Sequence, residues 1–153
     1  MILAIDPGTT QSGWCVYDPE GKGVLRSGVW GNKEMLDNIA PGMSATLAIE
    51  MVASYGMAVG REVFETVRWI GRFQQAWREP EAVRLIYRRD VKLHLCGSMR
   101  AKDTNVWQAL IDKLGPVGTK AEPGPLYGVK SHARSAVAVA VTAAETSDLG
   151  KLL

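Results

Sequence analysis

Short apolar runs broken by turn residues fill the first third of the chain. Each run has the length typical of a strand rather than a helix, and Pro and Gly residues stand between the runs. The pattern predicts strands over Met1–Ile5, about Gly13–Asp18 and about Val24–Trp30, with a turn at Pro19–Gly23. The stretch Gly31–Ser44 is predicted to be a loop or a short helix.

Helical spacing of apolar residues replaces this pattern in the rest of the chain. The predicted elements are a strand at Thr46–Glu50, a helix at Val59–Trp77 that ends before Pro80, a strand at Val83–Tyr87, a helix at Lys102–Leu114, a loop at Gly118–Gly128 and a helix from near Ser131 to about Thr146. His94 and Cys96 are assigned to a further strand. Antiparallel strands followed by alternating strands and helices predict an α/β fold with a sheet of mixed direction.

Composition narrows the class of protein. The 153 residues, 46% hydrophobic and 22% charged, are predicted to form one globular domain over residues 1–153. No uninterrupted apolar stretch reaches the roughly 18 residues of a membrane span, and no secretory signal is visible. The two cysteines, Cys15 and Cys96, are far apart and form no metal-binding pair. We therefore expect reduced thiols and a cytoplasmic location.

Charge is distributed unevenly, although the net charge is only +2. Residues 1–60 contain three Lys or Arg and six Asp or Glu, whereas residues 61–113 contain eleven and seven. An acidic site beside a basic surface is suited to a polyanion that is bound through its phosphates and attacked at a metal ion.

Two acids stand at the ends of predicted strands. Asp6 follows the run Met1–Ile5 and precedes a Pro-Gly turn, and Glu50 ends the strand Thr46–Glu50. Asp6 alone is also explained as a turn residue. If the two strands are neighbours, however, the carboxylates come close together, which is unfavourable unless a cation lies between them. Oxygen ligands of this kind suit Mg²⁺ or Mn²⁺.

Arginines form a stripe on the predicted helix Val59–Trp77. Arg61, Arg68 and Arg72 share one side of this helix. Their side is either a solvated face with ion pairs to Glu65 or a surface that follows DNA phosphates. The complete set of predicted DNA-binding residues is Arg61, Arg68, Arg72, Arg88, Arg89, Arg100 and Lys102. Trp69 and Phe73 are more often core residues than base-stacking residues in such a helix.

The last helix begins with polar residues and continues with alanine and valine. His132 and Ser135, three residues apart, share one face of its first turn. The apolar residues that follow indicate a buried helix, so this polar patch can face the acidic pocket. A neutral imidazole binds a metal or moves a proton.

These motifs together resemble the RuvC family of Holliday junction resolvases, within the ribonuclease H-like superfamily. The resemblance is carried by Asp6-Pro-Gly with Ser12-Gly13, by Ile49-Glu50 and by the late helix from His132 through Ala136-Val-Ala-Val-Ala. It spans nearly the whole chain and is closest to the phage and prophage branch. It implies a ribonuclease H-like mixed five-stranded sheet flanked by helices, a homodimer and a branched-DNA substrate such as a four-way junction.

The resemblance also implies a metal-dependent endodeoxyribonuclease. Asp6, Glu50 and His132 would be ligands of Mg²⁺, with Mn²⁺ as an alternative, and Ser135 would complete the catalytic set. Serine departs from the family pattern, which has an acid at this position, and a neutral hydroxyl binds Mg²⁺ weakly. Either the second metal is weakly held, or Asp103 stands in for the missing acid, or the chain binds branched DNA with little or no cleavage.

Two other functions are compatible with the motifs. Asp6-Pro-Gly-Thr-Thr also resembles the first phosphate loop of actin-like kinases and ATPases, but these proteins need two such domains to enclose a nucleotide. A branched-DNA-binding protein without cleavage is the stronger alternative, because Ser135 interrupts the acidic set. Incubation of a labelled junction with a divalent metal separates this alternative from the nuclease.

Overall fold

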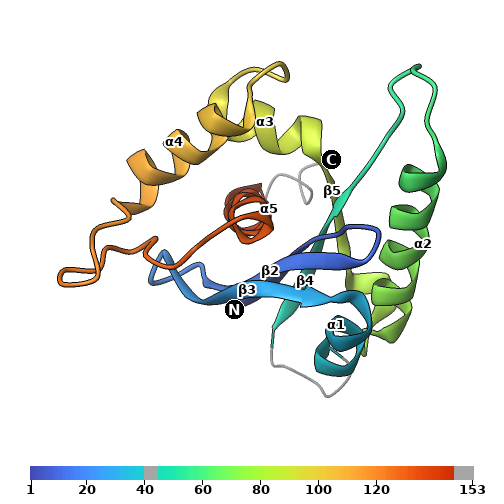
Figure 1. Ribbon diagram of the computed structural model, residues 1–153, viewed down its shortest axis with the longest axis horizontal. Coiled ribbons are helices and arrows are strands. Elements are labelled where there is room, and N and C mark those ends of the chain that lie inside the picture. The colour runs from blue at the N-terminus through green and yellow to red at the C-terminus, as the bar shows by residue number, and fades with distance from the viewer. Residues whose placement is uncertain (40–44, 147–153) are drawn as a thin grey trace.

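A five-stranded mixed sheet forms the centre of the molecule (Figure 1). The computed structural model describes residues 1–39 and 45–146. The strands are β1 (Ile2–Asp6), β2 (Gln11–Asp18), β3 (Gly23–Gly31), β4 (Thr46–Met51) and β5 (Arg84–Tyr87). They lie in the order β3-β2-β1-β4-β5, antiparallel among the first three in sequence and parallel from β1 to β4 and from β4 to β5. The mixed sheet that the sequence predicts is therefore confirmed.

Helices cover both faces of this sheet. They are α1 (Asn32–Ile39), α2 (Arg61–Ala76), a short 3₁₀ turn at Pro80–Ala82, α3 (Arg88–Cys96), α4 (Asp103–Leu114) and α5 (His132–Thr146). Helix α1 lies within the stretch predicted as a loop or short helix, of which residues 40–44 lie outside the described residues. None of the helices in the described ranges combines the length and hydropathy that a membrane-spanning helix needs.

The strand predicted around His94 and Cys96 is wrong, because residues 88–96 form helix α3. Val91 is buried in the core and Leu95 packs against it, so these two residues, four apart, define the inward face of a helix. Gly97 then ends α3 in the left-handed conformation, with φ of 71°.

Alternate residues of β1 serve two separate cores. Ile2 and Ala4 face the side of α3, α4 and α5, whereas Leu3 and Ile5 face the side of α1 and α2. Successive strand residues point to opposite faces, so a strand covered on both sides is apolar throughout. This alternation explains the continuous apolar run at the start of the chain, and it determines which face of the sheet each following residue occupies.

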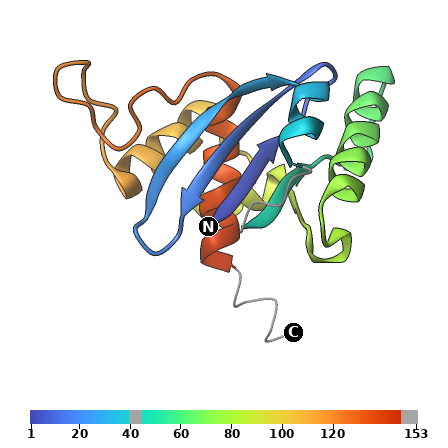
Figure 2. The same cartoon turned by 90° about the horizontal axis from the view of Figure 1, so that it is seen from below.

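Helix α5 is the central helix of its layer. It packs against β1 and β2 and is covered by α3 and α4, and Figure 2 shows it passing behind the strands. Nine of its residues, Ala133 and those from Ala136 to Ala143, are buried. Their small side chains fit between the sheet and the outer helices.

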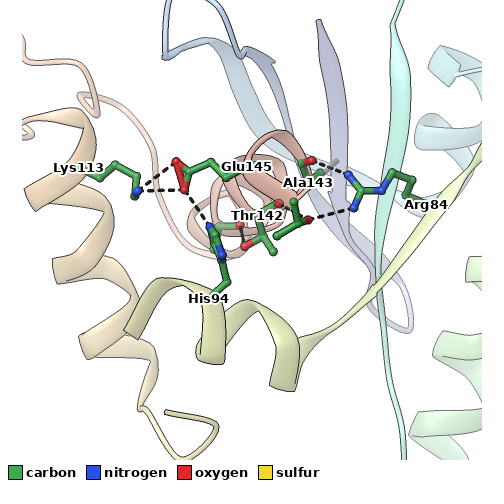
Figure 3. Close-up of polar contacts among 8 residues, drawn as sticks. Arg84, His94, Lys113, Thr142, Ala143 and Glu145 are labelled. Carbon is green, nitrogen blue, oxygen red and sulfur yellow. Dashed lines mark hydrogen bonds and ion pairs between the residues drawn. The ribbon is translucent and has the colours of Figure 1, made fainter. Parts of the chain in front are cut away.

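Polar contacts hold the C-terminal end of α5 (Figure 3). Glu145 accepts hydrogen bonds from His94 Nε2 and from Lys113 Nζ, each at 2.9 Å, which connect α5 to α3 and α4. Burial raises the pKa of Glu145, but these partners outweigh it and lower the pKa overall. Arg84 donates to the carbonyl of Ala143 and, at 3.0 Å, to Thr146 Oγ1. This end of α5 lies about 20 Å along the helix from His132.

Candidate active site where β1, β4 and α5 meet

The parallel pairing of β1 with β4 brings Asp6 and Glu50 together. The register pairs Ala4 with Ala48 and Ile5 with Ile49, so the acids that follow lie side by side at the ends of the strands. Each acid comes two residues after an alanine that faces α5, and both therefore face α5. The Asp6 side chain is 12% exposed and that of Glu50 is 6% exposed. The prediction that the two carboxylates lie close together is confirmed.

The pKa values of both carboxyl groups are raised in this arrangement. Burial raises the pKa of Glu50, and the charge of Asp6 and the hydrogen bond to Asp6 raise it further, to about 8. Burial also raises the pKa of Asp6, against the opposing effects of the hydrogen bond to Glu50 and of the Arg88 charge. Both shifts have the direction expected for two buried acids that lie side by side, because burial and a neighbouring negative charge disfavour the ionised form.

Helix α5 places an imidazole on this pair. His132 Nδ1 lies 3.2 Å from Asp6 Oδ2, and the His132 side chain is 56% exposed. Gly13 makes this position accessible, because it pairs with Asp6 across the β1–β2 ladder and lies against the backbone of His132. A Cβ at position 13 would lie less than 3.0 Å from the carbonyl group and Cβ of His132. Only glycine allows α5 to begin so close to β2.

A buried polar network holds the turn that follows Asp6. Ser12 Oγ donates to Asn32 Oδ1 at 2.6 Å, and Asn32 Nδ2 donates to the carbonyl of Gly8 at 2.9 Å. The amide of Gly8 donates back to Ser12 Oγ at 3.3 Å. Both Ser12 and Asn32 are buried. The sequence analysis included Ser12 among the motif residues but missed Asn32, whose only signal was a polar residue at a predicted loop.

Arg88 lies inside the acidic site. The sequence analysis assigned it to the DNA-binding surface, but its guanidinium contacts Glu50 Oε1 at 3.5 Å and donates to Asp103 Oδ1. Arg88 comes directly after β5, the strand beside β4, and this position carries its side chain to the acids. One cation thus partly compensates three carboxylates.

Asp103 and Ser135 line two adjoining hollows beside the acids. The larger, of about 370 Å³, lies between α4 and the first turn of α5 and also contains His132. The smaller contains Glu50 and Arg88. Asp103 is 73% exposed and pairs with Arg88, so it lies near Ser135 but at the outer rim of the site. The position of Ser135 is thus lined by a hydroxyl, with a peripheral carboxylate nearby.

The other predicted DNA-binding residues lie on two sides of the sheet. Arg61, Arg68 and Arg72 are exposed on α2, on the opposite face of the sheet from α5 (Figure 1). No ion pair joins Glu65 to Arg61 or Arg68 within the described ranges, whereas Arg72 stacks on Trp69 at 4.1 Å.

On the α5 side, Arg100 is exposed in the link between α3 and α4, and Lys102 is exposed at the start of α4. Arg89 stacks on Tyr55 at 4.8 Å, in the segment that follows β4. Arg89 follows β5 directly after Arg88, and Lys102 directly precedes Asp103, so both are neighbours in sequence of residues that line the acid site.

The donor set of this site suits a hard divalent cation. No group of three or more His, Cys, Asp or Glu side chains is arranged to hold a metal ion in the conformation of the described residues. Asp6 and Glu50 instead form a hydrogen-bonded pair, and the imidazole contacts Asp6. A buried carboxylate pair with raised pKa values and an arginine drawn against it indicates unbalanced negative charge. Oxygen donors of this kind are the ligands that Mg²⁺ prefers.

Comparison with known proteins identifies the fold. No protein-family model and no curated protein matches the chain. The structure of Thermus thermophilus RuvC is similar, with a TM-score of 0.69 and 22% identity, over 97% of this chain and 96% of that one. The structure of T. thermophilus RuvC in complex with Holliday junction substrate gives 0.70 and 21%, over 97% and 95%. The chain has a RuvC-like fold.

The likeness confirms the fold class that the sequence predicts. The predicted ribonuclease H-like α/β class is confirmed, with the acids at the ends of β1 and β4 and the late helix α5 across them. The similarity covers nearly the full length of both chains, so it includes every element that contributes a site residue. The phage-type origin stays a prediction.

Proposed function

We propose that this chain is a structure-specific endodeoxyribonuclease that hydrolyses phosphodiester bonds in branched DNA, four-way junctions among them. The observation that carries the proposal is the buried pair of Asp6 and Glu50 with His132 against it. It is supported by the RuvC-like fold, since one of the similar RuvC structures contains a Holliday junction substrate.

Asp6 and Glu50 would hold the metal, Mg²⁺ or Mn²⁺, through their carboxylate oxygens. A bound divalent ion supplies an activated water and neutralises charge on the phosphate. The chain's own contribution is to present two carboxylates in a site from which bulk water is largely excluded, on two strands that fix their separation. The network of Ser12 and Asn32 keeps the turn after Asp6 in place.

His132 would move the proton. Its Nδ1 contacts Asp6, which orients the ring and leaves Nε2 as the nitrogen that exchanges a proton with water or with the leaving oxygen. The exposure of the ring and its place in the larger hollow give it access to a bound strand. Arg88 would offset negative charge when the phosphate approaches the acids, as guanidinium groups do.

A homodimer would allow symmetric cleavage of a four-way junction. Two copies related by a two-fold axis would present two identical acid sites to a four-way junction, which has matching pairs of strands. Each copy would then nick one strand. The proposal therefore expects paired cuts on opposite strands of the junction.

A second candidate function is binding of branched DNA without efficient cleavage. It is favoured by Ser135, which provides a hydroxyl in place of an acid, and by Arg88, whose guanidinium already contacts Glu50. In this alternative the acids serve the structure of the site and the arginines serve affinity.

One experiment separates the two functions. An end-labelled four-way junction is incubated with the protein in Mg²⁺, in Mn²⁺ and in EDTA, and both binding and strand cleavage are measured. The nuclease proposal expects metal-dependent cuts at matching positions on opposite strands. Binding without any cut in either metal would support the second function, and absence of binding to the junction would contradict both.

A further inference from the structure

We propose that the hollow between α4 and the first turn of α5 is a nucleobase pocket, in which a base next to the scissile phosphate stacks on Trp107. The inference rests on the proposed nuclease or junction-binding function and names a subsite of it. The hollow measures about 370 Å³, within the range of small-ligand pockets.

The lining of this hollow fits a base rather than a phosphate. Its apolar part comes from one face of α4, where Val106 and Trp107 are partly buried and Leu110 is fully buried. Its polar residues lie around this apolar part and are Asp103, Thr104, Ser131, His132, Arg134 and Ser135. An aromatic surface with hydrogen-bonding groups beside it is the arrangement by which proteins hold unstacked bases.

The hollow is continuous with the acid site. Asp103, Val106 and Ser135 line both this hollow and the smaller one that contains Glu50 and Arg88. His132, which contacts Asp6, lines the larger hollow directly. A nucleotide whose phosphate lies at the acids therefore has the larger hollow as an adjoining recess. At a branch point the bases are less firmly stacked than in a duplex, so turning one outward needs less energy.

Arg134 completes the stacking surface. Its guanidinium lies 4.3 Å from the centre of the Trp107 ring, and its Nε donates to the carbonyl of Val129 at 3.4 Å. Arg134 itself is exposed. A guanidinium held over an indole can stack on a base and contact the adjoining phosphate. The pair thus places an indole and a positive charge together in the lining of the hollow.

The same kind of pair occurs at Trp69 and Arg72, where the distance is 4.1 Å. That pair lies on α2, across the sheet from the acid site. It provides a matched control, because it has the same chemistry but no connection to Asp6 or His132.

The test uses 2-aminopurine, a fluorescent base whose emission falls when it stacks on an aromatic ring. Four-way junctions that carry 2-aminopurine at successive positions beside the branch point are bound in EDTA, so that cleavage plays no part. We expect quenching at one position with the wild type and with Trp107→Phe. We expect Trp107→Leu to abolish that quenching and to weaken junction affinity about fivefold or more.

A second variant keeps the test independent of the core packing of Trp107. Thr104 is exposed and lines the hollow, so Thr104→Leu fills part of the hollow without adding an aromatic ring, while Trp107 stays in place. It is expected to remove the quenching as Trp107→Leu does, whereas Trp69→Leu leaves it unchanged. Circular dichroism confirms that each variant is folded.

The outcomes distinguish failure of this inference from failure of the proposed function. If the wild type does not bind the junction, the proposed function is overturned and the pocket with it. If it binds, but quenching is absent or survives both Trp107→Leu and Thr104→Leu, only the pocket is overturned. Loss of quenching in Trp69→Leu alone would place the stacking on α2 and would also overturn it.

Discussion

Gly13 and His132 are in contact at a point where no larger side chain fits on the glycine. The contact lets α5 begin directly above β2, and Gly13 is also the ladder partner of Asp6. The distance from His132 to Asp6 therefore depends on residue 13 having only a hydrogen atom as its side chain. This relationship gives glycine a defined role in the site.

Gly13→Ala is expected to displace the first turn of α5 and to separate His132 from Asp6. Overpacking of this kind lowers the free energy of unfolding by about 1–3 kcal/mol. Junction cleavage should fall more steeply than stability, because the catalytic geometry is lost before the fold. Thermal unfolding and a cleavage assay below the transition temperature measure the two effects.

Gly31→Ala is the matched control for this substitution. Gly31 also lies in a strand, at the end of β3, but no atom lies within 4 Å of where its Cβ would be. The Gly31→Ala variant should cleave junctions like the wild type. Equal loss of cleavage in both variants would contradict the role assigned to Gly13.

The stability of the metal-free protein should fall as pH rises from about 4.5 to about 8. The pKa of Glu50 is about 8 in the folded state, above its ordinary value of 4.5, so the folded state binds more protons in this window. The resulting loss of stability is absent below about 4.5 and complete above about 8. Each pH unit of the window corresponds to at most about 1.4 kcal/mol.

Glu50→Gln tests this dependence because it cannot ionise. Melting temperatures measured in EDTA should converge for the wild type and the variant at low pH, and the variant should become the more stable as pH rises. A wild type that gains stability relative to Glu50→Gln over this range would show that the carboxylate is not held in a buried, cation-free pair.

Arg88→Gln should increase the stabilisation that Mg²⁺ gives to the protein. Arg88 is the cation that contacts Glu50 and Asp103, and without it the acids repel one another more strongly. A divalent ion would relieve a larger repulsion. The measurement is the rise in melting temperature that Mg²⁺ causes in the variant and in the wild type, at about pH 9, where the acids are ionised. Arg89→Gln is the control, and equal shifts in the two variants would contradict this role.

Ser135→Asp should lower the Mg²⁺ concentration needed for junction cleavage. Ser135 lines both hollows beside the acids, so a carboxylate at this position adds an oxygen ligand where the chain has a hydroxyl. Thr104→Asp adds the same charge to the larger hollow only and should have little effect. If the Mg²⁺ requirement is the same for Ser135→Asp and the wild type, position 135 is not at the metal.

The first strands and the acids at their ends were predictable because both depend on local pattern, whereas the pairing of β1 with β4 that joins the acids was a condition of the prediction. The apolar runs before Asp6 and Glu50 are strands, and alternation along them determines which face each acid occupies. His132 followed from a polar turn at the start of an apolar helix. These signals lie within a few residues of each position and need no knowledge of distant contacts.

The remaining features depend on contacts that sequence spacing does not encode. Arg88 was predicted to extend the basic surface, and its contact with Glu50, which follows from its place after β5, was not foreseen. The close approach of Gly13 to His132 joins residues more than a hundred positions apart. In α3, His94 and Cys96 fit the alternation of a strand, whereas Val91 and Leu95, four residues apart, have the spacing of the helix that forms.

The most direct test of the account is cleavage of a labelled four-way junction by Asp6→Asn in Mg²⁺, with binding measured on the same DNA. Cleavage should fall by about a hundredfold or more while junction binding stays unchanged. Asp18→Asn, which alters the acid at the end of β2, should cleave like the wild type. Normal cleavage by Asp6→Asn would contradict the assignment of the β1–β4 acids as the catalytic centre.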